Sequence, residues 1–143
     1  MRITAIIFVS LLLVAIFLVV AWQHDVRYYS TDGIRNILTA LEAYKQRYKS
    51  YPSHFSALGG SPIEPDSAEH SHLIDDVLSS GEKSGYKIYY TPIESKHNGN
   101  IDAFKITFEP TIAHQNRHYF VDQTKVIRIE YGRNASETSP VFH

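Results

Sequence analysis

Two histidines and two aspartates stand close together near the middle of this 143-residue chain, in a pattern that could bind a metal ion. His70 and His72 are separated by one residue, and Asp75 and Asp76 follow shortly after them. Imidazole and carboxylate groups are both ligands of zinc. A His-x-His pair without further regularly spaced ligands is, however, typical of a solvated loop. We therefore predict no metal site, and name His70, His72 and Asp75 as the candidate ligands if a metal were bound.

Two other groups of residues have the right chemistry for a metal but the wrong spacing. His114 and His118 would share a face only on a helix, and their segment is predicted to be a loop entering a strand. The acidic residues Glu64, Asp66 and Glu69 could hold calcium, but they lack the regular oxygen ligands and the glycine of a calcium loop. We predict that both groups are solvated surface residues.

Catalytic patterns are absent from the sequence. Ser79 and Ser136 are not part of a nucleophile elbow, and no glycine-rich phosphate loop occurs. The neighbouring carboxylates Asp75 and Asp76 would point about 100° apart on a helix, which is poor geometry for joint acid–base catalysis. With no cysteine, thiol chemistry and disulfides are excluded. We predict neither an enzyme nor a cofactor.

The charge composition indicates whether the chain could bind nucleic acid. The formal net charge is −1, and basic residues form no cluster. Nucleic-acid binding normally requires a concentrated positive patch. We therefore expect no nucleic-acid partner.

An amphipathic helix is predicted over residues 24–51. Apolar residues recur there at steps of three and four, which places them along one stripe of a helix. The proline at position 52 disfavours helical geometry at Tyr51 and ends the helix. The residues of the stripe are Ile34, Ile37, Leu38, Leu41, Tyr44 and Tyr48.

Residues 52–84 form a predicted connector with one short helix over 73–79, and residues 85–133 change to alternating apolar and polar positions. Alternation is the pattern of half-buried strands. It predicts about four antiparallel strands with one apolar face, which the amphipathic helix would cover. The expected fold class is α+β, and residues 134–143 are expected to be a loose tail. The alternating segments are Tyr86–Tyr90, Phe104–Phe108, His118–Val121 and Ile127–Tyr131.

The run from Ile3 to Trp22 contains no charged residue. About 20 apolar residues can cross a bilayer as a helix, so we predict a transmembrane anchor over residues 1–23 with the lipid bilayer as its partner. Arg2 precedes the run, which places the N-terminus in the cytoplasm and the C-terminal domain outside, in the periplasm of a bacterial cell. A cleaved signal peptide is the alternative.

Several short motifs are spread along the predicted elements: Leu41–Tyr44, Tyr51–Ser53, Ala57–Gly60, Leu73–Asp75, Ser84–Tyr86, Tyr119–Gln123 and Val126–Arg128. Together with the order of the parts, these motifs resemble type IV pilins and the pseudopilins of type II secretion. The resemblance implies a long N-terminal helix, first transmembrane and then amphipathic, packed on an antiparallel sheet. It also implies a non-catalytic structural or assembly role through contacts with other pilin-like or secretion-system proteins.

One feature departs from that family. Members normally carry a basic leader ending in glycine and a glutamate near the start of the mature helix, whereas here Arg2 runs directly into Ile3 and the first acidic residue is Asp25. We therefore expect a retained membrane anchor, unless the true start lies upstream. The alternative function is an anchored or secreted extracytoplasmic domain that binds a small ligand or metal ion through the connector and the loop over residues 92–100.

Overall fold

The computed structural model describes residues 14–16, 31–61, 63–96, 99–113 and 115–143. Residues 31–48 are helical throughout, and residues 14–16 are helical as well. The helix ends where Lys49 adopts a left-handed conformation with φ of 63° and donates its N–H to the carbonyl of Lys45 at 2.9 Å. The apolar stripe forms the buried face of this helix: Ile34, Ile37, Leu38, Leu41 and Tyr44.

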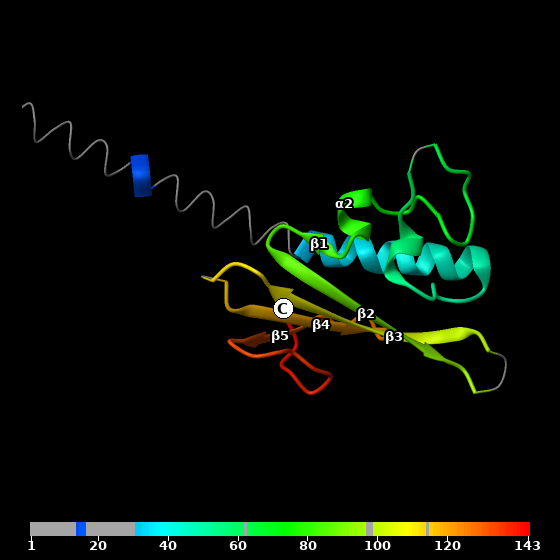
Figure 1. Ribbon diagram of the computed structural model, residues 1–143. Helices are drawn as coiled ribbons and strands as arrows, with labels where there is room; N and C mark the ends of the chain where they lie inside the picture. Colours follow the sequence, from blue (N-terminus) through cyan, green and yellow to red (C-terminus); the bar gives the residue numbers. More distant parts are fainter. Residues whose placement is uncertain (1–13, 17–30, 62, 97–98, 114) are drawn as a thin grey trace, which may run out of the picture.

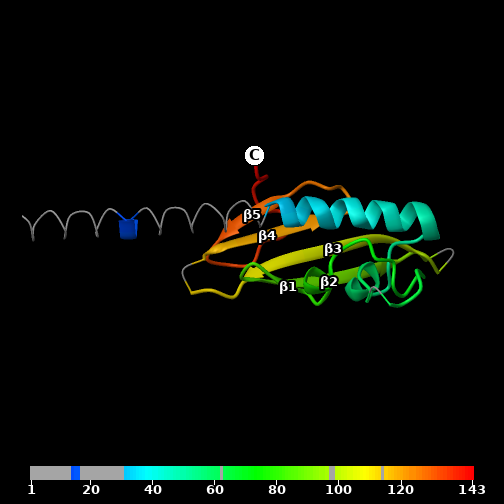
Figure 2. The same cartoon turned by 90° about the horizontal axis from the view of Figure 1, so that it is seen from above.

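Five antiparallel strands follow in sequence order, so the sheet is a simple meander. Two short helices precede them, η1 (Phe55–Leu58) and α2 (Asp76–Ser79). Figures 1 and 2 show the helix of residues 31–48 lying along one face of this sheet. The strands are β1 (Glu82–Lys83), β2 (Tyr86–Glu94), β3 (Ile101–Pro110), β4 (Arg117–Asp122) and β5 (Arg128–Tyr131).

The helix and the inner face of the sheet bury each other's apolar side chains. Because successive strand residues point to opposite faces, every second residue of β2, β3 and β4 enters the core. Tyr51 follows the helix and packs its ring edge-on against Phe104, with the ring centroids 4.8 Å apart. The buried residues of the inner face are Tyr86, Ile88, Ile101, Phe104, Ile106, Phe108, Tyr119, Val121 and Ile129.

The β2 edge of the sheet is only partly covered. β1 pairs with Tyr86 and Lys87 alone, and the Ile88 N–H continues the contact by donating to the carbonyl of Gly81 at 2.7 Å. Alternation then turns the nitrogen of Pro92 toward the same edge, where its missing N–H costs no hydrogen bond within the sheet. A proline on a free edge also discourages pairing with another strand.

The opposite edge, along β5, is covered by the end of the chain. Val141 forms a bridge with Arg128, the Ile129 N–H donates to the carbonyl of Pro140, and the Phe142 N–H donates to the carbonyl of Ile127, each at 2.9 Å. The ring of Phe142 packs edge-on against Tyr119, with the centroids 5.9 Å apart. Residues 140–142 therefore extend the sheet beyond β5.

Residues 134–139 lie against the outer face of β3, β4 and β5. Asn134 donates to Glu109 at 2.9 Å, Lys105 contacts Glu137 at 3.2 Å, and Ser139 is buried. Phe120, an outward residue of β4, is only 4% exposed. The end of the chain thus makes far more contacts than the expected loose tail.

The structure corrects the predicted fold class. The sheet has five strands rather than about four. Within the described ranges, no helix combines the length and the apolar character needed to cross a membrane. This finding overturns the long N-terminal helix, transmembrane and then amphipathic, and the single-pass membrane localisation inferred from it. Most of the predicted anchor, residues 1–13 and 17–23, lies outside the described residues.

Candidate functional site

The connector holds most of the residues that could do chemistry, and backbone contacts attach it to the core. The buried Ser71 donates its hydroxyl to the carbonyl of Ala57 at 2.8 Å, and the Leu73 N–H donates to the carbonyl of Leu58 at 2.8 Å. Tyr44, on the helix, donates its hydroxyl to the carbonyl of Ala68 at 2.8 Å. The loop between η1 and α2 is therefore held at both its ends and its middle.

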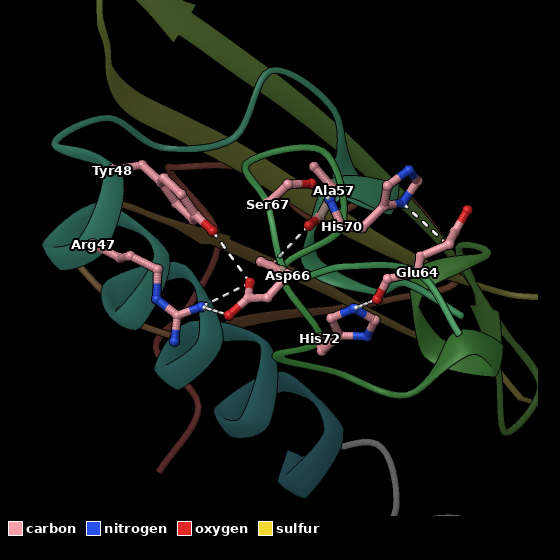
Figure 3. Close-up of polar contacts among 9 residues, drawn as sticks. Arg47, Tyr48, Ala57, Glu64, Asp66, Ser67, His70 and His72 are labelled. Atoms are coloured by element: carbon pink, nitrogen blue, oxygen red, sulfur yellow. Dashed lines mark hydrogen bonds and ion pairs between the residues drawn. The ribbon is translucent and has the colours of Figure 1, made fainter. Parts of the chain in front are cut away.

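Asp66 accepts two hydrogen bonds from one guanidinium nitrogen of Arg47, at 2.7 and 3.0 Å, and a third from the Tyr48 hydroxyl at 3.3 Å (Figure 3). Both charged side chains are about half exposed, at 46% for Arg47 and 53% for Asp66. Exposed pairs of this kind contribute little to stability. The contact attaches the loop to the helix, and both carboxylate oxygens of Asp66 accept hydrogen bonds.

The three candidate metal ligands do not converge on one point. His70 lies with Nδ1 3.5 Å from a carboxylate oxygen of Glu64, while Nε2 of His72 lies 3.1 Å from the backbone carbonyl of Glu64 (Figure 3). Asp75 instead caps α2 by accepting the Leu78 N–H at 2.9 Å, and it pairs with Lys83 at 2.6 Å.

The electrostatics of Asp75 agree with a structural role. The ammonium group of Lys83 and then the N–H of Leu78 hold the pKa of Asp75 below its usual value. In the part of the chain that the structure describes, no three His, Asp or Glu residues are grouped as a metal site would require.

The residues of the other two groups, which were predicted to be solvated surface residues, make separate contacts. Glu69 lies 3.3 Å from His54, Glu64 lies beside His70, and Asp66 is held by Arg47. His118 lies on the outer side of β4 opposite Glu130, and His114 lies outside the described residues. The acidic side chains are thus held in different places by different partners.

A cavity of about 240 Å³ lies between the start of the described helix and the sheet. Its walls are mostly apolar, and they come from the helix, from α2 and from the four strands β1 to β4. Burial, together with the neighbouring Tyr119, raises the pKa of Tyr86 well above its usual value, so its hydroxyl stays neutral. The main wall residues are Ile37, Leu78, Tyr86, Ile88, Phe108 and Tyr119.

Comparison of the chain with known proteins gave no match. No protein-family model, no curated protein and no solved structure matches it. The resemblance to pilins and pseudopilins therefore stays a prediction.

No local sequence pattern predicts the cavity, because its walls come from segments far apart in the chain. Gly33 lines the cavity and lies within a helix, where glycine is a poor choice.

Proposed function

We propose that this chain is a non-catalytic structural or assembly protein that acts through contacts with other proteins, as its resemblance to pilins and pseudopilins implies. The observation that carries the proposal is the uncovered outer face of β2 and of the adjoining part of β3. The rest of the outer face is occupied by residues 134–139, and the far edge by residues 140–142.

The uncovered face includes a small group of uncharged side chains, which we call the open patch: Tyr89, Thr91 and Ile93 on β2, with Ala103 and Thr107 on β3. Tyr89 is 43% exposed and Ile93 is 38% exposed. The register places Tyr89 opposite Thr107, Thr91 opposite Lys105 and Ile93 opposite Ala103, so these side chains share one face of the sheet. Lys105, which pairs with Glu137, lies between Ala103 and Thr107 and adds a charged residue to the border of the patch.

The chemistry of the open patch suits a protein partner. Tyrosine combines a large apolar ring with a hydroxyl, and it is enriched where proteins meet. The ammonium group of Lys87 lies 5.5 Å from the centre of the Tyr89 ring, which adds a positive charge at the rim. Because the five side chains of the patch include no carboxylate, histidine or cysteine, the patch favours recognition over catalysis.

Site-specific photo-crosslinking in the native host tests this proposal. A photoreactive residue at position 89 or 93 should give discrete adducts with protein partners, whereas the exposed position 138 on the covered side should give none. In the position-89 protein, Ile93→Lys should reduce the adducts at least about fivefold, because it places a charge in the apolar contact. As the matched control, Thr138→Lys should leave the adducts unchanged.

Two results would contradict the proposal. Equal adduct yields at positions 89 and 138 would show that the open patch is not a preferred surface. The absence of protein adducts at both 89 and 93 would reject an assembly role for this face.

A further inference from the structure

We propose that the cavity between the helix and the sheet is a binding site for a small, neutral aromatic molecule that carries one hydrogen-bonding group. This inference goes beyond the assembly role, because the cavity faces the helix whereas the open patch lies on the outer side of the sheet. It uses none of the residues of the open patch.

The size and the walls of the cavity fit a single aromatic ring. The cavity is open to solvent at one side and measures about 240 Å³. An apolar cavity of about 150 Å³ is large enough to bind benzene. The rings of Tyr86 and Tyr119 have centroids 5.8 Å apart and are tilted by 57°, and Phe108 adds a third ring to the wall. Such walls offer edge-to-face contacts to an aromatic guest.

Gly33 provides independent support. A Cβ atom added at Gly33 would meet no other heavy atom within 4 Å, so no crowded neighbour requires glycine there. The residue lies in the helical run 31–48 and is not among the glycines with positive φ, so the backbone does not require glycine either. The space beside Gly33 is therefore open, and a side chain at position 33 would have room to enter the cavity.

The charges at the mouth favour a neutral ligand. Asp32 and Lys83 both line the cavity, but Asp32 lies 3.7 Å from Arg35 and Lys83 pairs with Asp75 at 2.6 Å. Each charge therefore already has an opposite partner, and a charged ligand would lose its hydration without gaining an unpaired counterion.

The mouth also offers a hydrogen bond to the polar group of a ligand. Asn36 and Ser84 line the cavity and are exposed, so the cavity opens to solvent beside them. Amide and hydroxyl groups can both donate and accept. A ring in the cavity could thus direct one hydroxyl or N–H toward these two side chains.

Titration of the full chain with phenol and with indole, followed by methyl NMR signals of Ile37, Leu78 and Ile88, tests the inference. Both probes should give saturable shifts of these signals. Benzoate and benzylammonium, which have similar rings but a charge, should bind at least about tenfold more weakly. No saturable shift with either neutral probe, or equal binding of the charged probes, would overturn the proposal.

Two blocking variants locate the site. Ile37→Phe and Gly33→Leu place extra side-chain volume at the cavity wall, and each should weaken binding of phenol at least about tenfold while thermal unfolding stays cooperative. Val77→Phe is the matched control, because Val77 is adjacent to Leu78 on α2 but is 62% exposed and does not line the cavity. Affinity unchanged in both blocking variants would place the phenol site elsewhere and refute the inference.

Discussion

The two edges of the sheet, which we call its β5 end and its β2 end, are protected from pairing with another strand in different ways. At the β5 end, residues 140–142 pair with the edge and residues 134–139 cover the outer face. At the β2 end, the two-residue strand β1 covers a short part of the edge, and Pro92 lies on the remainder. One end is therefore closed by the chain itself, and the other is left open but unsuited to strand pairing.

The same difference appears in two aromatic residues of the outer face. Phe120 on β4 is 4% exposed because the end of the chain lies over it, while Tyr89 on β2 is 43% exposed. The alternation pattern places both side chains outward, so the pattern alone would give them the same environment. Burial on this face therefore depends on a segment that is distant in the sequence, residues 134–139.

Removing residues 134–143 should have the largest effect on this contrast. The truncation uncovers Phe120, removes the Phe142–Tyr119 contact and frees the β5 edge. We expect the free energy of unfolding to fall by about 4–6 kcal/mol, from the lost packing and hydrogen bonds together. Chemical denaturation would measure the loss, and sedimentation would detect association through the freed edge. A truncated protein as stable as the full chain would show that the β5 end is not closed by this segment.

A pair of alanine substitutions tests whether the outer face is packed differently at Phe120 and at Tyr89. Phe120→Ala should lower the free energy of unfolding by about 3 kcal/mol, the usual cost of a large cavity in a packed region. Tyr89→Ala should change it by about 0.5 kcal/mol, as expected for an exposed position. Both are measured by thermal or urea unfolding of otherwise identical proteins. Equal losses at the two positions would mean that the ends are packed alike.

The smallest expected effect is the loss of folding stability in acid. Near each edge of the sheet, one carboxylate should contribute to this loss. Glu42 accepts from the Tyr51 hydroxyl at 2.8 Å and pairs with Lys125 at 3.0 Å, in the turn between β4 and β5. Burial acts to raise the pKa of Glu42, but the hydrogen bond from Tyr51 and the pairing with Lys125 outweigh it, and the net pKa is lowered. Asp75, paired with Lys83 of β1, also has a lowered pKa.

Because both pKa values are lower in the folded state, the stabilisation is present above the usual pKa of these carboxyl groups and is lost as the pH falls through the folded-state values. Glu42→Gln should therefore reduce the acid dependence of stability, by less than about 1 kcal/mol in total. Asp75→Asn should have a smaller effect, because the Asp75 side chain is more exposed, at 52% against 33%. Melting temperatures of the two variants, measured from pH 7 down to acidic pH, would show which substitution has the larger effect. A larger effect of Asp75→Asn than of Glu42→Gln would contradict this expectation.

Prediction from the sequence succeeded where the controlling interactions are local. The spacing of Ile34, Ile37 and Leu41 indicated the helical stripe, and all three are fully buried. The four alternating segments correspond to β2, β3, β4 and β5. β1 was missed because two residues are too short to show a period. The candidate metal ligands show that closeness in the sequence does not predict that side chains converge. Asp75 caps α2, while His70 and His72 contact Glu64.

The sequence by itself therefore determined which residues face inward along each element, because the periods of a helix and a strand are properties of neighbouring residues. Only the tertiary structure decided that Phe120 is covered while Tyr89 is open, and that Gly33 and Ile37 border a cavity with residues of the sheet. Those outcomes depend on where distant segments meet. Side-chain burial and the space left between elements arise from packing in three dimensions, which no local pattern records.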